Sequence, residues 1–485
     1  MSEVTERPAV LVACADSLEY LRAIPDGTYH ACVTDPPYGL GDPPDPADVL
    51  QQWATAGDWH PRSGKAKGFM GAAWDKFVPG PAIWREVYRV LKPGAYCAVF
   101  AGTRTWDWMS LALRFAGFEV TDTLMWLHGQ GFPKGGDVGK RIDEMLGAER
   151  EVVGEHPNPA GNRPGGSAYM MGVTGMPETA QITAPATPEA ARWHDCSTTL
   201  KPAWEPIILA QKPHQGSAAR NCVDYGAGAL RVGACRIGLM TQAEVARSGR
   251  STSGMFAPGG VDWLRDGREP QGRWPANLAL DEEAAAALDE QVGYLHGAGN
   301  KSPHAFSRVG YEGGWKPKPV TQHDRGGMPS RFFYCAKANK GDRDEGLDHL
   351  LPPAEGPERD QGERSGLGRV DETHDLGAKL ERWPDGSLRP RVTPPAKRRN
   401  THPTVKPEAL MRWLTRLVCP PWGELLDPFA GSGSTGKAAA LEGLRATCVE
   451  REPDFAEVAR ARVAAALCRA AESAPAEVAP TAAAA

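Results

Sequence analysis

Apolar positions in the first part of the chain follow two alternating spacings. Short apolar runs, typical of buried strands, occupy residues 9–13, 30–34, 96–101 and 118–127. Stretches with the periodicity of amphipathic helices occupy residues 17–24, 83–91 and 106–115. Strands that alternate with helices form parallel sheets with helices packed on their faces. Residues 1–127 therefore predict half of a doubly wound α/β sheet.

The regular pattern stops after residue 127 and resumes near the end of the chain. Residues 205–211 predict a strand that returns to the sheet. Further along, the pattern predicts helices at 407–418, 434–441 and 454–467 and strands at 424–427 and 446–450. Between these parts, residues 39–73 and 154–187 are interpreted as loops. Residues 214–395 are interpreted as a separate or inserted region with a helix at 281–291 and a strand at 331–336.

Composition narrows the class of protein. The chain has 485 residues, 41% hydrophobic, with a formal net charge of −5, which suits two or three globular domains. Mild acidity argues against a protein coated in basic charge, but it allows a local basic groove. No signal-peptide pattern, run of 18 apolar residues, C-x-x-C pair or H-E-x-x-H motif occurs. We therefore expect a cytoplasmic protein with reduced cysteines, no membrane span and no metal.

The first chemical motif is Asp35-Pro36-Pro37-Tyr38, directly after the strand predicted at 30–34. In isolation it reads as a turn, because Asp-Pro starts turns. Its position at the carboxyl end of a parallel strand is, however, where α/β proteins hold their chemistry. An amino group on an aromatic ring could donate to the carboxylate of Asp35 and the carbonyl of Pro36, which would localise the lone pair of its nitrogen. The ring of Tyr38 could stack on that aromatic ring.

The second motif is a Gly-rich turn at residues 427–436, DPFAGSGSTG, between a predicted strand and helix. Glycines let the backbone approach a ligand, and a helix N-terminus offers free N–H groups. A purely structural turn is about equally compatible with this stretch. Residues 431–437 also fit the phosphate-loop pattern, but Ala438 stands where Mg²⁺ binding needs Ser or Thr. A phosphate-loop ATPase is therefore the less favoured alternative.

Two further positions follow from these turns. Glu450 ends the next predicted strand, about 20 residues after the Gly-rich turn, where an acid can bind ribose hydroxyls. A solvated acid is the alternative. Lys406, in the segment 400–407, could pair with a carboxylate of a cofactor; a surface lysine is the simpler interpretation of that residue alone.

Together, DPPY, HPTVKP (402–407) and DPFAGSGSTG resemble the motifs of the DNA amino-methyltransferases. That family uses S-adenosylmethionine to methylate adenine N6 or cytosine N4. The catalytic motif precedes the cofactor motif here, as in the β group with permuted order. The resemblance covers residues 8–130, 200–213 and 396–465. It implies a doubly wound, mostly parallel, seven-stranded Rossmann-like sheet, circularly permuted, with a large inserted target-recognition region.

The resemblance also implies domain boundaries. The catalytic domain would comprise residues 1–213, with a loop-rich insert at about 130–200, and residues 396–468. Residues 214–395 would form the target-recognition region, and the Ala/Pro-rich residues 469–485 a disordered tail.

Site residues are carried over from the family motif by motif. The catalytic residues that line the target-base pocket would be Asp35, Pro36, Pro37 and Tyr38. The residues that bind the cofactor would be Asp427, Pro428, Phe429, Gly431 and Gly433, with Glu450 at the ribose, Thr404 and Lys406 near the methionine end, and Asp16 at the adenine.

A basic stretch lies beside the third motif. Residues 382–406 hold seven basic side chains and one acid. Phosphate contact explains such a run next to an active-site motif, and a solvated loop is the alternative. We expect Arg391, Lys397, Arg398 and Arg399 to bind double-stranded DNA.

The resemblance thus implies a DNA methyltransferase that acts on a flipped base. It favours adenine N6, because cytosine-N4 members of this group more often begin the catalytic motif with Ser, where this chain has Asp35. Cytosine N4 is the alternative target. A non-catalytic DNA-binding protein is a further, less favoured one. A homodimer, a partner nuclease and membership of a restriction-modification system stay open, and the recognition sequence is not readable.

Overall fold

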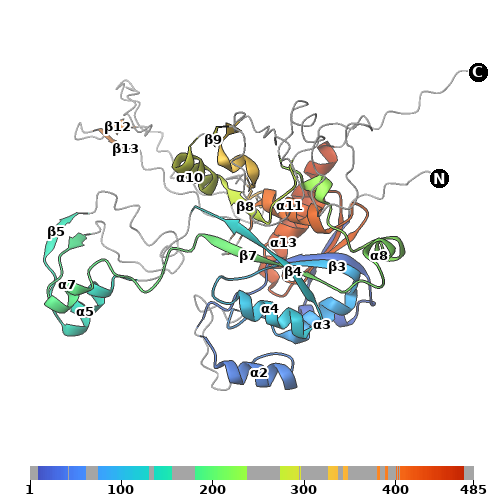
Figure 1. Ribbon diagram of the computed structural model, residues 1–485, viewed down its shortest axis with the longest axis horizontal. Helices are drawn as coiled ribbons and strands as arrows, with labels where there is room; N and C mark the ends of the chain where they lie inside the picture. The colour runs from blue at the N-terminus through green and yellow to red at the C-terminus, as the bar shows by residue number, and fades with distance from the viewer. Residues whose placement is uncertain are drawn as a thin grey trace, which may run out of the picture.

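The computed structural model describes residues 9–41, 43–61, 75–129, 136–155, 181–237, 273–293, 295–296, 326–336, 342–347, 380–382, 388–390, 400, 402 and 405–473. Its centre is a sheet with helices on both faces (Figure 1). Nine strands of the described residues form this sheet in the order β1 (Val10–Cys14), β15 (Arg445–Glu450), β14 (Glu424–Asp427), β2 (Tyr29–Thr34), β3 (Leu91–Phe100), β7 (Trp204–Gln211), β4 (Glu119–Leu127), β8 (Leu278–Asp281) and β11 (Tyr334–Ala336).

Strand direction is mixed but largely parallel. All neighbouring pairs in this sheet are parallel except the two that β7 makes, with β3 on one side and β4 on the other. The predicted α/β class with a mostly parallel sheet is therefore confirmed. The sheet is wider than the seven strands predicted, because β8 and β11 from the region 214–395 extend its edge. Strand β11 lies within the strand predicted at 331–336, whereas the short β8 was not predicted.

The two distant halves of the pattern meet at the middle of the sheet. Strand β14 lies parallel to β2, with Leu425 opposite Ala31 and Leu426 opposite Cys32. From this pair the chain continues to β15 on one side and to β3 on the other. Loops that leave the two strands therefore separate and open a crevice between them.

Alternating residues of the central strands face two apolar layers. Cys32, Cys97 and Leu426 pack against one set of helices, α1 (Ser17–Arg22), α3 (Pro81–Val90) and α4 (Trp106–Phe115). Their neighbours along the strands, such as Val33 and Ala98, pack against α11 (Glu408–Val418) and α12 (Ser434–Leu441). Helix α13 (Pro453–Ser473) packs against α12 and β1. Figure 1 shows α3 and α4 on the side of the sheet opposite α11 and α13.

Two predicted loops contain regular structure. Helix α2 (Pro46–Thr55) lies inside the predicted loop 39–73: Asp45 caps it by accepting from Ala47 N, and Val49 and Trp53 bury its apolar face. The cap and the proline in the first turn are helix-start signals that the surrounding Gly and Pro obscured.

Residues 136–155 and 181–200 form a small unit away from the sheet (Figure 1). It contains α5 (Val138–Leu146), β5 (Val152–Glu155), β6 (Gln181–Thr183) and α7 (Pro188–Arg192). Buried Asp143 joins its parts, because its carboxylate accepts from Ala186 N, Thr187 N and Arg150. The sequence predicted a loop-rich insert here, although Val138, Ile142 and Met145 have the spacing of an amphipathic helix, so α5 was missed.

Other predicted boundaries shift. The strand predicted at 331–336 begins with a 3₁₀ turn at Pro329–Phe332, and only Tyr334–Ala336 are extended. Helix α13 runs to Ser473, so residues 469–473 of the predicted disordered tail are helical. Arg469 explains the extension, because it pairs with Glu345 and Glu408. The remaining described elements are α8 (Ala218–Tyr225), η2 (Val232–Cys235), α10 (Glu282–Val292), β9 (Leu295–His296), β10 (Gly326–Gly327), β12 (Leu380–Arg382) and β13 (Leu388–Pro390).

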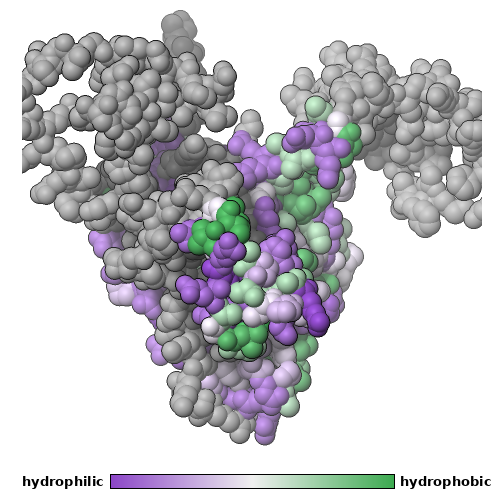
Figure 2. Space-filling model, turned by 90° about the vertical axis from the view of Figure 1, so that its left-hand side faces the viewer, coloured by the Kyte–Doolittle hydropathy of each residue, from purple (hydrophilic) through white to green (hydrophobic). Residues whose placement is uncertain are grey.

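The described surface carries scattered apolar residues. On the face in Figure 2, hydrophobic residues of the described part form small groups separated by hydrophilic ones. Among the described helices, none combines the length and apolar composition that a membrane span requires.

Candidate active site

A cavity of about 660 Å³ opens where β1, β2, β14 and β15 end. In such sheets, ligands usually bind at the carboxyl ends of the strands, at the point where the strand order reverses. The cavity brings together most of the residues predicted from the motifs, and its lining includes Asp16, Asp35, Pro36, Pro37, Tyr38, Lys406, Asp427, Pro428, Phe429, Gly431 and Glu450.

Four polar side chains meet on one side of this cavity. Lys406 Nζ lies 2.8 Å from Asp35 Oδ2 and 3.2 Å from Glu205 Oε2. The Tyr38 hydroxyl lies 2.8 Å from Asp35 Oδ1 and 2.9 Å from Glu205 Oε2, and it accepts from Lys406 at 3.1 Å. The Lys406 side chain is only 5% exposed. Its ammonium group therefore holds the two carboxylates and the phenol as one cluster.

Burial and charge act in opposite directions in this cluster. Burial raises the pKa of Asp35 above its ordinary value, although Lys406 opposes the rise. Burial also favours neutral Glu205, but Lys406 and Tyr38 outweigh it and hold the pKa of Glu205 low. Burial disfavours charged Lys406, but Asp35 and Glu205 outweigh it and hold its pKa high. The geometry thus gives Asp35 a carboxylate that is more basic than a solvated one.

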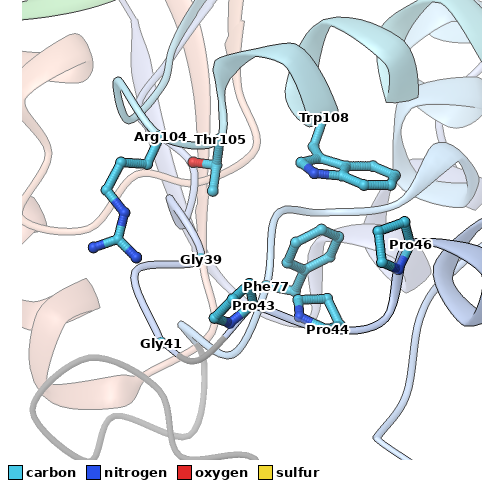
Figure 3. A pocket seen from close by; sticks show the side chains of 9 residues that line it. All are labelled: Gly39, Gly41, Pro43, Pro44, Pro46, Phe77, Arg104, Thr105 and Trp108. Atoms are coloured by element: carbon cyan, nitrogen blue, oxygen red, sulfur yellow. The ribbon is translucent and has the colours of Figure 1, made fainter.

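A second, smaller hollow of about 380 Å³ is lined by a residue that holds the backbone of Tyr38 (Figure 3). One wall carries Arg104, Thr105 and Trp108, and the opposite wall carries prolines and Phe77, whose ring centroid lies 5.6 Å from that of Trp108. Thr105 Oγ1 donates to the Tyr38 carbonyl at 2.5 Å. The segment 35–38 is therefore held from outside the larger cavity as well as from within it.

The Gly-rich turn closes the other side of the cavity. Gly431 and Gly433 have φ angles of +51° and +78°, which favour glycine. A Cβ on Gly431 would lie 2.7 Å from His402 Nε2, and one on Gly433 would lie 2.9 Å from Ala459 Cα. Gly431 lines the cavity, whereas Gly433 caps α12 and packs against α13 beneath it. The turn therefore exposes backbone where a ligand could approach closely.

Glu450 and Asp16 flank this turn. The Glu450 carboxylate accepts from Gly431 N at 2.7 Å and from Glu452 N at 2.8 Å. Burial raises the pKa of Glu450. Asp16 Oδ1 accepts from Leu18 N and Glu19 N, so it caps α1 at the edge of the cavity. Both side chains are held in place by backbone donors.

Asp427 joins the two motifs directly. Its Oδ1 accepts from Thr34 Oγ1 at 2.6 Å and from Phe429 N at 3.0 Å, and the residue is 2% exposed. Burial raises its pKa to about 6, because these hydrogen bonds only partly replace the lost water.

Asp427→Asn is expected to stabilise the fold at pH 7. The amide keeps the acceptor for Thr34 and Phe429 and removes a charge that burial disfavours. The difference between a pKa of about 6 and the ordinary 3.8 corresponds to about 3 kcal/mol. Because the folded-state pKa is the higher one, wild type loses this stability as the pH rises from about 4 to 6. Urea unfolding at pH 4 and pH 7 should therefore show a gain only at pH 7.

Asp143→Asn is the matched control of opposite sign. Burial favours neutral Asp143, but hydrogen bonds from Ala186, Thr187 and Arg150 outweigh it and hold its pKa low. This variant should be less stable than wild type at pH 7, and the difference should fade as the pH falls. An Asp427→Asn protein that loses stability at pH 7 would contradict the cost assigned to the buried charge.

Lys437, the lysine of the phosphate-loop pattern, points away from the turn. Its side chain is 1% exposed and contacts Asp342, Glu345 at 2.6 Å and Glu408 at 3.1 Å. Arg462 joins the same network and donates to the Ser432 carbonyl at 2.6 Å. A phosphate-loop lysine must reach a bound phosphate, whereas this one binds three carboxylates. The geometry therefore opposes the ATPase alternative.

Five predicted site residues lie outside the described residues: Thr404, Arg391, Lys397, Arg398 and Arg399. One residue of the cluster, Glu205, was not predicted. Its only signal is an acid at the start of an otherwise apolar strand, and such a position is usually a solvated strand end.

Comparison with known proteins places these motifs in context. The sequence matches the family model of N6 and N4 DNA methylases over residues 29–461. The type II methyltransferase M.ScaI of Streptomyces caespitosus is 35% identical over 78 residues. That match covers 15% of this chain and 26% of M.ScaI, so the chain matches about a quarter of the length of this curated relative.

Three solved structures are similar to the chain at low identity. The M1.HpyAVI complex with SAM gives a TM-score of 0.32 at 11% identity, with 94% of this chain and 100% of that chain covered. The cytosine-N4-specific PvuII DNA methyltransferase gives 0.35 at 10%, with 97% and 96% covered. TTHA0409 of Thermus thermophilus, complexed with S-adenosyl-L-methionine, gives 0.31 at 15%, with 95% and 96% covered.

Proposed function

Because the chain belongs to the family of N6 and N4 DNA methylases, we propose that it transfers a methyl group from S-adenosylmethionine to the exocyclic amino group of a base in double-stranded DNA. The observation that carries the proposal is one cavity that holds both motifs. Asp35 and Tyr38 line one side, and the Gly-rich turn with Glu450 lines the other. Methyl transfer needs its two reactants held in one site.

The residues at the Gly-rich turn fit the cofactor. Gly431 lines the cavity without a side chain, in a backbone conformation with φ of +51° that favours glycine. Glu450 is oriented by two backbone N–H groups, and a carboxylate there suits ribose hydroxyls. Asp427, Pro428 and Phe429 would form the wall beside it. When bound, S-adenosylmethionine supplies an electrophilic methyl group on its sulfonium.

The chain's own residues prepare the target amine. Asp35 accepts one amine hydrogen and the Pro36 carbonyl accepts the other, which localises the nitrogen lone pair toward the cofactor. Tyr38 stacks on the base, a contact of about 1–3 kcal/mol. A base within a duplex cannot reach the cavity, so the target flips out of the helix.

Adenine N6 is the favoured target, because the first catalytic position is Asp, whereas cytosine-N4 members of the permuted group more often have Ser there. The order of the motifs, with Asp35 before Asp427, supports circular permutation. We further propose that residues 214–395 read the target sequence and that the basic residues near 391–399 contact DNA phosphates.

Methyl transfer to duplex DNA tests the function directly. The protein is incubated with DNA and S-adenosylmethionine carrying a labelled methyl group, and the DNA is digested to nucleosides. Label in N6-methyladenine is expected, and sequencing of the modified sites gives the recognition sequence. Label only in N4-methylcytosine would overturn the adenine assignment, and absence of label from DNA would overturn the function.

A further inference from the structure

Glu205 is the member of the polar cluster that no motif accounts for. It lies near the start of β7, opposite Trp126 of the antiparallel strand β4. Its carboxylate lies 2.9 Å from the Tyr38 hydroxyl and 3.2 Å from Lys406 Nζ. The side chain is 26% exposed, and His128 is the other titratable group near it.

The charges of the cluster do not cancel. Asp35 and Glu205 carry two negative charges and Lys406 carries one positive charge, so the three sum to one negative charge. Lys406 lies closer to Asp35 than to Glu205. With Asp35 as its sole partner, this buried ammonium group would neutralise that carboxylate completely.

We propose that Glu205 is a positioning residue that shares Lys406 with Asp35 and so keeps the charge of Asp35 available to the target amine. The proposal rests on the proposed function, and it assigns a role to a side chain outside the motifs.

The charge balance of the reaction explains why this matters. The target nitrogen bonds to the methyl carbon as the carbon–sulfur bond breaks, and that electron pair stays on sulfur. The nitrogen is then cationic until it gives a proton to the Asp35 carboxylate. With Glu205, the negative cluster and the cationic nitrogen sum to zero. Without it, a neutral cluster faces a positive charge in a buried site, which destabilises the transition state.

Glu205→Gln tests the proposal, with Glu205→Asp as the conservative variant and Glu86→Gln as the control. Glu86 is 23% exposed and pairs with Arg89 on α3, outside the cavity. The single-turnover rate of methyl transfer is expected to fall about 100-fold in Glu205→Gln. Glu205→Asp should recover a large part of the rate, and Glu86→Gln should match wild type.

The pH dependence separates charge from mere structure. Glu205 raises the pKa of Asp35, so its removal should lower that pKa. The acidic limb of the rate profile should therefore move to lower pH in Glu205→Gln. A wild-type rate in Glu205→Gln, or a slow rate with an unmoved acidic limb, would overturn the proposal.

A second readout does not depend on methyl transfer. In cofactor-free protein with ¹³C-labelled aspartate carboxyls, the Asp35 signal is assigned by its loss in Asp35→Asn. Its titration midpoint should be lower in Glu205→Gln than in wild type, and an unchanged midpoint would overturn the proposal. If the midpoint is lower in Glu205→Gln but the wild-type protein methylates no DNA, the proposed function is refuted instead, so the two failures are distinguishable.

Discussion

Asp35→Ala is expected to reduce the rate of methyl transfer by about 1,000-fold or more. The variant removes the acceptor of the amine hydrogen and the base that takes the proton, and such groups contribute about 100- to 10,000-fold. It also leaves Lys406 with Glu205 alone, so a neutral pair replaces the negative cluster. Single-turnover transfer of labelled methyl to duplex DNA measures the effect.

Cofactor affinity should change little in this variant, because the Gly-rich turn and Glu450 lie across the cavity from Asp35. Calorimetric titration with S-adenosylmethionine checks this. Asp26→Ala is the matched control: its carboxylate is 79% exposed, pairs with Arg89 and is not among the residues that line the cavity. Transfer at the wild-type rate by Asp35→Ala would refute the role of Asp35, even if DNA methylation itself were established.

Lys437→Met is expected to destabilise the protein by about 3–5 kcal/mol. The substitution keeps an unbranched side chain that is one atom shorter, but it leaves Asp342, Glu345 and Glu408 without their central cation. Removing one partner of a buried ion pair typically costs this amount, because the remaining charges stay buried. Because Arg462 and Arg469 also contact these carboxylates, we expect a loss near the lower end of that range.

Urea unfolding at pH 7 measures this loss. Lys140→Met, at an exposed position of α5, is the control and should change the free energy of unfolding by less than about 0.5 kcal/mol. Lys437→Met also tests the phosphate-loop ATPase alternative. In such an enzyme the substitution would abolish Mg²⁺-dependent ATP hydrolysis rather than lower the stability. An unaltered free energy of unfolding would show that the three carboxylates do not need Lys437.

The catalytic core was predictable where apolar spacing and motifs agree. Strand β2 is a short apolar run followed by Asp35, and β14 is a short apolar run that ends at Asp427, so both strands could be identified from the sequence. Helix α2 was missed because the Gly and Pro around it indicated a loop. The helix forms because its cap, Asp45, and its leading proline outweigh that composition. In each case the local signal, not the overall composition, decided the structure.

Contacts between distant polar residues could not be predicted. The sequence placed Lys406 near the cofactor, but nothing in it shows that Glu205, 201 positions earlier, reaches the same ammonium group. Lys437 likewise finds Asp342 across 95 positions. Such pairs depend on the tertiary arrangement, and a charged residue in a loop looks the same in sequence whether it is solvated or buried.

The hydrogen bond between Thr34 and Asp427 joins residues 393 positions apart, and this separation has a consequence during synthesis. At about 5–20 residues per second, the ribosome makes Asp427 roughly 20 to 80 seconds after Thr34. Throughout that time β2 lacks its β14 neighbour and remains an unpaired edge with apolar faces. A nascent chain in this state is prone to wrong pairing. Its dependence on chaperones should therefore end only when the last strands have emerged.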